Sequence, residues 1–278
     1  MRIRHRYGFS TEDRQIIRFL KRHDIPFQQD ELTITIVIFE DDDKFTSINE
    51  FFEKKDVVDV VEAVYDKSEL EAADWLTIKS GWWSQYPQPE EAMGYMFTTY
   101  DASMYCPGIN GEYSCGKGLV QKKPFVIKKR PNWGPRNFMM LNWVPDELFV
   151  SAKAATILRE SKLRGFSLWD VLGKSQKPYD SVKQLKVENC IPKSVIQTSI
   201  KERFVCPNCG FEKFIPVVGP MKFNKSAFTN IDYDIVKTED KFGDVGCDSM
   251  ILVSHSFYDT IVKNKIGKGL VFEPVEIV

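Results

Sequence analysis

Two features are scarce in this 278-residue sequence: histidine and long apolar runs. The three histidines, His5, His23 and His255, lie in different segments, which argues against a histidine-based catalytic site. No stretch approaches the roughly 20 apolar residues that a membrane-spanning helix needs. The arginine-rich start of the chain is not followed by the apolar segment of a signal peptide. We therefore expect a cytoplasmic protein with no membrane partner.

Common catalytic motifs are absent as well. The sequence contains no HExxH, GxSxG or P-loop pattern. His255 follows Ser254 at an expected helix start, where a capping position explains it. Asp146 and Glu147 form a pair of carboxylates, but a turn before Phe149 explains them equally well. These absences favour a non-enzymatic protein.

The sequence also lacks a large net charge of either sign. Its formal charge is −1, and 43% hydrophobic and 28% charged residues indicate a globular, soluble protein. The charge is unevenly spread, because residues 40–91 carry 15 acidic and 5 basic side chains, whereas residues 117–136 carry 7 basic and no acidic ones. Separated patches of this kind can steer charged partners.

Four of the six cysteines form two pairs. Cys106 and Cys115 are bounded by Cys-Pro and Cys-Gly, and Cys206 and Cys209 form a shorter Cys-Pro-Asn-Cys-Gly knuckle. Such a turn points two thiolates at one position, and its glycine lets backbone N–H groups face the sulfurs. In a reducing compartment, paired cysteines indicate a metal site rather than disulfides. We expect Cys106, Cys115, Cys206 and Cys209 to bind one structural Zn²⁺.

Redox or idle thiols and another metal are the alternatives to zinc. A redox CxxC usually opens a helix, whereas Val205 and the segment 211–217 around the second pair favour a strand, a turn and a strand. The two remaining cysteines, Cys190 and Cys247, are expected to be buried or idle thiols.

Residues 1–80 are expected to form an N-terminal lobe. A strand over 2–9 is followed by a helix capped by Ser10, and 32–39 and 57–65 are apolar, β-branched strands. A further short strand after Pro26 gives the order βαββαβ of a ferredoxin-like fold. Without that strand the lobe is a plain α/β unit, and the sequence leaves both open.

Residues 81–278 are expected to form a second domain that contains an internal repeat. Residues 149–171 match 252–275, and each copy predicts a strand, an N-cap serine, a helix, a glycine C-cap and a strand. One cysteine pair precedes each copy, so the repeats extend over about 100–172 and 200–278. The fold class is therefore α+β: the N-terminal lobe followed by a duplicated domain of zinc knuckles and strand–helix–strand units.

Residues from about 95 to 278 resemble the double-CXXCG proteins. The resemblance rests on these motifs: Cys106-Pro and Cys115-Gly, Gln121-Lys-Lys-Pro-Phe125, Pro131-x-Trp-Gly134, Leu141-Asn-Trp-Val-x-Asp-Glu147, and Cys206-Pro-x-Cys-Gly210. The longer loop of the first knuckle departs from the family pattern. Some of these proteins are grouped with immunity proteins of bacterial contact-delivered toxin systems. The resemblance implies a cytoplasmic protein that binds and neutralises a toxin encoded nearby, with zinc as a scaffold.

Nucleic-acid binding is the alternative function, since zinc ribbons often bind DNA or RNA. Basic residues that interleave with Phe125 and Trp133 would pair phosphates while the rings stack on bases. The candidate residues are Lys117, Lys122, Lys123, Lys128, Lys129 and Arg130. Charge runs are more often solvated faces, and lysines near a four-thiolate zinc offset its negative charge.

Overall fold

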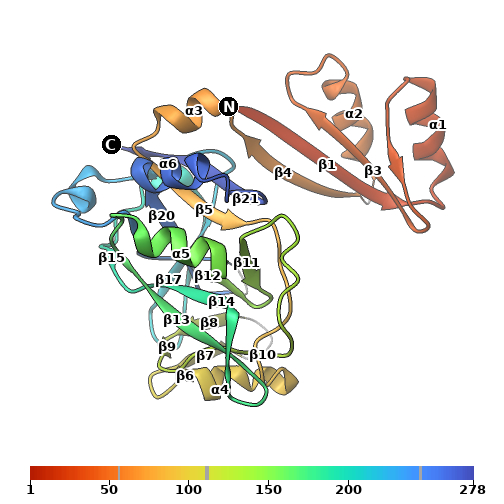
Figure 1. Ribbon diagram of the computed structural model, residues 1–278. Coiled ribbons are helices and arrows are strands. Elements are labelled where there is room, and N and C mark those ends of the chain that lie inside the picture. The colour runs from red at the N-terminus through yellow and green to blue at the C-terminus, as the bar shows by residue number, and fades with distance from the viewer. Residues whose placement is uncertain (56, 110–112, 244–245) are drawn as a thin grey trace. The chain divides into compact units, whose positions relative to one another are not determined.

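The computed structural model of the chain describes residues 1–55, 57–109, 113–243 and 246–278 (Figure 1). It is a mixed α+β structure with 21% helix and 43% strand, as the fold class predicted at this coarse level. The chain divides into two compact units: unit 1 comprises Met1–Glu69 with Val218–Pro220, and unit 2 comprises Leu70–Val217 with Met221–Val278. Within the described ranges, no helix has both the length and the apolar composition to cross a bilayer.

Unit 1 is an antiparallel sheet with two helices. Its elements in chain order are β1 (Arg2–Ser10), α1 (Arg14–Arg22), β2 (Gln28–Gln29), β3 (Thr33–Phe39), α2 (Phe45–Phe52) and β4 (Val58–Val64). The strand order is β2-β3-β1-β4, and each neighbouring pair is antiparallel. The observed succession of elements is therefore β-α-β-β-α-β.

Alternation along β3 explains which face of this sheet is buried. Ile34, Ile36 and Ile38 are buried while their neighbours are not, as a strand with one covered face requires. They form one core with residues of β1, α1 and α2. Helix α1 is capped by Asp13, whose carboxylate accepts the N–H groups of Gln15 and Ile16. The predicted cap, Ser10, is wrong because β1 extends through that residue.

The boundary between the units lies near residue 69 rather than residue 80. Helix α3 (Lys67–Ala72) spans it, and β5 (Trp75–Ser80) belongs to unit 2. β5 pairs with two strands from the C-terminal part of the chain, β20 (Asp248–Ser254) and β21 (Leu270–Ile277). The sequence alone assigned it to the N-terminal lobe because its partners are about 175 residues or more away.

Unit 2 contains two larger sheets and two small two-stranded sheets. The five-stranded sheet has the order β10-β13-β14-β12-β11, formed by β10 (Val126–Ile127), β11 (Phe138–Leu141), β12 (Val144–Ser151), β13 (Phe166–Gly173) and β14 (Pro178–Val187). The eight-stranded sheet has the order β16-β17-β19-β20-β5-β21-β18, with β15 beside β19. Its other strands are β15 (Cys190–Ile191), β16 (Ile200–Val205), β17 (Glu212–Pro216), β18 (Met221–Phe223) and β19 (Ile235–Phe242).

The smaller elements of unit 2 complete the chain. They are η1 (Glu91–Met93), α4 (Tyr95–Thr99), β6 (Tyr100–Asp101), β7 (Cys106–Ile109), β8 (Tyr113–Lys117), β9 (Val120–Gln121), η2 (Gln197–Ser199) and η3 (Lys225–Phe228). β6 pairs with β9, and β7 pairs with β8, each antiparallel.

The two larger sheets correspond strand by strand. The run β10-β13-β14-β12-β11 has the same pairing directions as β18-β21-β5-β20-β19: the first pair is parallel and the other three are antiparallel. The central strand differs in origin, because β14 follows β13 in the chain, whereas β5 precedes all the other strands of unit 2. The two halves therefore share a strand arrangement although one of the five strands enters from the other end of the sequence.

A helix accompanies each half. α5 (Ala152–Glu160) follows β12, and α6 (His255–Lys263) follows β20. The predicted serines cap both helices, since Ser151 accepts the N–H of Ala154 and Ser254 that of Phe257. The larger side chains that face inward from both helices belong to one core cluster with residues of β5, β11, β12, β14, β19 and β20. Burial of this shared cluster holds the halves of unit 2 together.

Candidate metal centre

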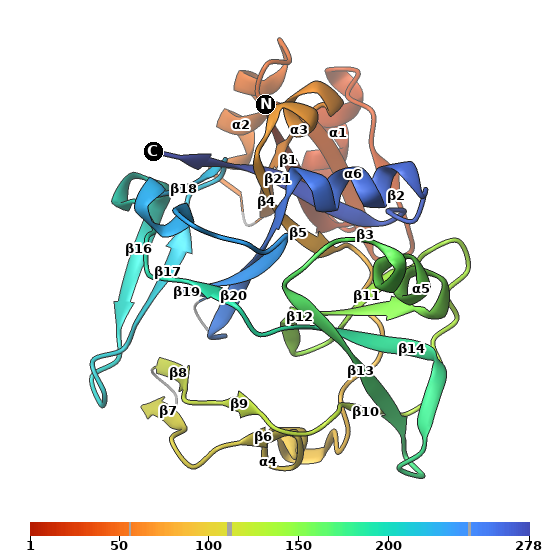
Figure 2. The ribbon, with the colours of Figure 1, turned by 60° about the vertical axis from the view of Figure 1, so that its left-hand side comes forward.

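The first knuckle is the hairpin of β7 and β8. Strands β7 and β8 lie side by side (Figure 2). Cys106 begins β7 and pairs in register with Lys117, and Cys115 lies within β8. Gly116 has a φ of +77°, and a Cβ there would lie 2.6 Å from the Cβ of Cys247. Glycine is therefore needed at this position for both its backbone angle and its lack of a side chain. This knuckle has a longer loop than the second, and part of that loop, residues 110–112, lies outside the described residues.

The second knuckle is the turn between β16 and β17. The N–H of Cys206 donates to the carbonyl of Phe211 at 2.8 Å, and the N–H of Gly210 donates to the carbonyl of Cys206 at 2.8 Å. Gly210 has a φ of +67°, which favours glycine. The flanking strands are antiparallel, so the predicted strand–turn–strand geometry around this pair is observed and a helix-opening redox motif is not.

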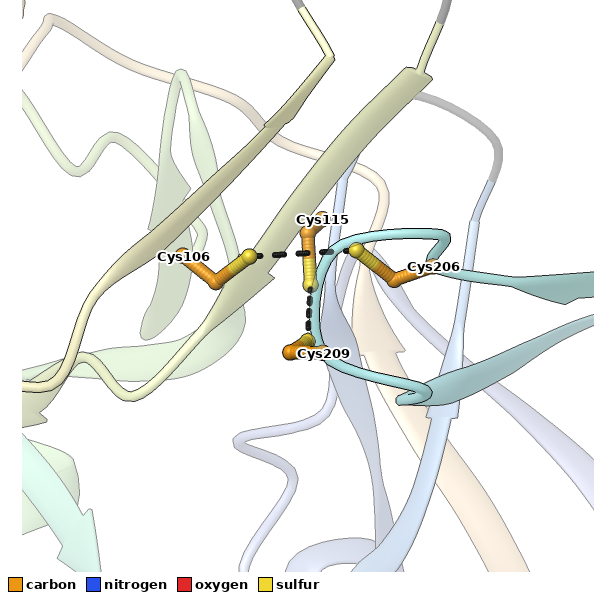
Figure 3. Close-up of side chains that lie close together, drawn as sticks. All are labelled: Cys106, Cys115, Cys206 and Cys209. Carbon is orange, nitrogen blue, oxygen red and sulfur yellow. Dashed lines mark hydrogen bonds between the residues drawn. The ribbon is translucent and has the colours of Figure 1, made fainter.

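The two knuckles bring all four predicted cysteines together (Figure 3). The Sγ atoms of Cys106 and Cys206 are 3.8 Å apart, and those of Cys115 and Cys209 are 3.7 Å apart. All four sulfurs lie within 4.8 Å of one another. A tetrahedron with metal–sulfur bonds of about 2.3 Å has sulfur–sulfur edges of about 3.8 Å, whereas a disulfide needs about 2.05 Å. The arrangement therefore suits a tetrahedral metal ion.

Direct contacts also join the knuckles. Asn208, between the cysteines of the second knuckle, donates from Nδ2 to the carbonyl of Gly108 in the first at 2.6 Å. The ammonium group of Lys117 lies 5.4 Å from the ring centre of Phe211, within the range of a cation–π contact. Each close sulfur pair and each of these contacts takes one partner from each knuckle, so the centre connects segments about 100 residues apart.

The protein environment acts differently on individual thiols. Burial opposes ionisation of Cys206, but the backbone N–H groups of Cys209 and Asn208 favour its thiolate and lower the pKa to about 7. Burial raises the pKa of Cys115 far above its ordinary value, against the effect of the Lys117 N–H. At neutral pH Cys206 is thus ready to ionise, whereas Cys115 would need a bound cation to be held as a thiolate.

Cys190 and Cys247 do not join the cluster. Cys190 is an exposed free thiol on β15, so of the predicted alternatives, buried or idle, it is not the buried one. Cys247 packs behind Gly116, and burial raises the pKa of its thiol to about 11. A protonated thiol at this position fits an idle residue better than a nucleophile.

The predicted nucleic-acid residues are exposed, but one of the two predicted aromatic partners is buried. All six basic side chains, Lys117, Lys122, Lys123, Lys128, Lys129 and Arg130, are exposed. Phe125 is fully buried in the core, and the indole N–H of Trp133 donates to the carbonyl of Ser181 at 2.9 Å. The predicted stacking of bases on Phe125 is therefore wrong, because its ring lies in the core, whereas Trp133 is half-buried and packs against that core.

A buried charge network near the centre was missed by the sequence reasoning. Lys237 on β19 lies 2.8 Å from the carboxylate of Glu147 and 3.4 Å from that of Asp146, both on β12. Burial alone would lower the pKa of Lys237, but the two carboxylates raise it. Asp146 and Glu147 lie in a strand rather than a turn, and they join the two larger sheets. Nothing in the local sequence indicates this pairing across 90 residues.

Comparison with known protein families finds no family that matches the chain, and a search of curated proteins finds no relative. The likeness to the double-CXXCG proteins therefore rests on the motifs alone.

Proposed function

We propose that unit 2 binds one structural Zn²⁺ through Cys106, Cys115, Cys206 and Cys209. The observation that carries this proposal is the convergence of four thiols, with no disulfide geometry, at distances that fit a tetrahedral ion. Four cysteine ligands complete the coordination of zinc and leave no position for water or substrate. The ion would therefore stabilise the protein rather than catalyse a reaction.

Zinc at this position would couple metal binding to folding. Its ligands come from two hairpins about 100 residues apart in the chain, so the unfolded chain cannot present a preformed site. Binding free energy then contributes directly to folding. The hydrogen bond from Asn208 to Gly108 also joins the two knuckles, in the orientation that brings their four sulfurs together.

Metal analysis of purified protein tests this proposal. We expect one zinc per chain in the wild type and none in the Cys106→Ser and Cys209→Ser variants. Cys190→Ser is the matched control, because this thiol is exposed and outside the cluster, and it should retain the full zinc content. Zinc retained in both cluster variants, or no zinc in the wild type, would contradict the proposal.

We further propose that the protein is a non-enzymatic binding protein whose partner is a toxin, as the likeness to immunity proteins implies. A closed four-cysteine site supports a binding role over catalysis. The acidic stretch supports a basic partner, because Asp41, Asp42 and Asp43 are exposed on unit 1 and complementary charge accelerates association. Co-purification with a toxin encoded beside it is the expected result. A complete screen of such neighbours that finds no binding would overturn this role without affecting the zinc proposal.

Binding to nucleic acid is the second candidate, and the exposed basic side chains of residues 117–130 are the observation that favours it. The burial of Phe125 removes the predicted stacking platform. This function therefore depends mainly on phosphate contacts, which weaken steeply with salt. Absence of retention on DNA and RNA at low salt excludes it.

A further inference from the structure

A cavity of about 400 Å³ in unit 2 lies beside the knuckles and is lined by aromatic rings. The rings belong to Tyr95, Tyr100, Tyr105, Trp143 and Phe211. Tyr95 and Trp143 lie nearly parallel, with centroids 6.1 Å apart and an angle of 18°, and Tyr100 meets Tyr95 edge-on at 68°. Burial raises the pKa of Tyr95 to about 12, so its hydroxyl stays neutral.

Carboxylates outnumber ammonium groups in the wall of this cavity. Asp146, Glu239 and Asp248 line it together with Lys117 and Lys241. Lys241 donates to the hydroxyl of Ser249 at 2.6 Å, and Lys117 lies over the ring of Phe211. Asp146 is already paired with Lys237, so a bound cation would rely on Glu239 and Asp248. Burial and the neighbouring charge of Asp146 raise the pKa of Asp248 to about 7. A cation bound beside Asp248 would favour the ionised carboxylate, and the two charges would stabilise each other.

Trp143 lies in the two-residue turn between β11 and β12, where Leu141 pairs with Val144. This residue has a φ of +67°, an unfavourable conformation for a bulky side chain. It leaves the indole 45% exposed at the cavity rather than in the core. Two-residue hairpin turns use positive φ angles, so the turn accounts for this backbone angle and presents the indole to the cavity.

We propose that this cavity binds a small organic cation carrying an ammonium or guanidinium group. Aromatic faces attract such cations, and carboxylates pair with their N–H donors. The volume suits a diamine or a single lysine or arginine side chain rather than a whole polymer segment. Gly116 and Phe211 of the two knuckles form part of the wall, so the knuckles hold the cavity in shape.

Calorimetric titration of the full-length, zinc-replete protein tests the proposal with agmatine, putrescine and, as an anionic control, glutarate. We expect saturable binding of a cation with a Kd at or below about 1 mM and none of glutarate. Asp248→Asn and Trp143→Ala should each weaken binding at least about tenfold, because they remove a carboxylate and an aromatic face. Asp180→Asn, an exposed carboxylate on β14, should bind as the wild type does.

Short neutral-capped peptides that contain one lysine or arginine distinguish the source of the cation. Tighter binding of agmatine or putrescine indicates a free small molecule, and tighter binding of a peptide indicates a partner's side chain; either result supports the proposal. No saturable binding of any cation would overturn it. Wild-type affinity in both cavity variants, with zinc content unchanged, would overturn it as well. Neither negative result bears on the zinc proposal, which metal analysis tests separately.

Discussion

Asn208 joins the two knuckles through a side chain that carries no sulfur. Its amide donates to the carbonyl of Gly108, a buried residue, at 2.6 Å. Asn208→Ala leaves that carbonyl without its partner, and we expect a loss of about 1–3 kcal/mol in the free energy of unfolding. The four sulfurs remain, so zinc content should be unchanged while zinc transfer to a chelator becomes faster. Unchanged transfer kinetics would show that the metal alone orients the knuckles.

Asp248 gives unit 2 a pH dependence with a defined sign. Its folded-state pKa of about 7, raised by burial and the charge of Asp146, lies above its ordinary value of 3.8. Between these values the folded state binds more protons than the unfolded state, so this group's contribution to stability falls as pH rises from about 4 to 7. Asp248→Asn should remove that contribution and stabilise the protein at pH 8 by at most about 4 kcal/mol.

Urea unfolding of both proteins between pH 6 and pH 8, with zinc bound, measures this difference. Comparison of the variant with the wild type cancels the pH dependence of the thiolates, which both share. An Asp248→Asn variant that is less stable than the wild type at pH 8 would contradict the assignment.

At this scale the sequence predicted residues whose roles depend on local spacing. Cys206 and Cys209 form a knuckle within five residues, and Ser151 and Ser254 precede their helices directly. Lys237 and Glu147 could not be paired from the sequence, because their contact depends on how two sheets pack. Asn208 likewise carries no signal that separates it from any turn asparagine.

The helices α5 and α6 begin in the same way, and their caps provide a matched pair of tests. Each serine hydroxyl accepts a helix N–H and also donates onward, Ser151 to Asn137 and Ser254 to Asp234, both at 2.8 Å. Ser151→Ala and Ser254→Ala should each lower the free energy of unfolding by about 1–2 kcal/mol.

Chemical denaturation of these variants measures the effect of each cap. Ser256→Ala is the control, since this exposed serine lies within α6 rather than at its cap and should change stability by less than about 0.5 kcal/mol. Equal effects of Ser254→Ala and Ser256→Ala would contradict the capping role.

Elements with a local signal were predicted, and elements with distant partners were placed incorrectly. The apolar alternation of β3 and the repeated strand, serine and helix around α5 and α6 are visible within a few turns of chain. Nothing in the sequence of β5 indicates that it lies between β20 and β21. The likeness of β5 to β14 is apparent only when both sheets are compared. Duplication of the knuckle-containing halves stays a prediction that this shared strand order supports.

For the whole molecule, removal of the metal should affect the two units unequally. Unit 1 has a core of its own, in which Tyr7, Leu20 and Phe52 are buried, whereas the cysteine cluster belongs entirely to unit 2. A strong chelator should therefore increase amide hydrogen exchange in unit 2, most of all in β7, β8, β16 and β17, and leave residues 1–69 protected. Equal loss of protection in both units would contradict a structural role confined to unit 2.

The α+β class was predictable because composition and strand periodicity are properties of the whole sequence. The division into units was predicted only approximately, since β5 transfers residues 75–80 to unit 2. The partner, the cytoplasmic location and the absence of enzymatic activity stay predictions, because they depend on molecules outside the chain.

X-ray absorption at the zinc edge of the purified protein tests the central claim most directly. The account predicts a first shell of four sulfur atoms at about 2.3 Å and no nitrogen or oxygen ligand. A shell with three or fewer sulfurs, or with a bound oxygen, would contradict a closed structural site formed by Cys106, Cys115, Cys206 and Cys209.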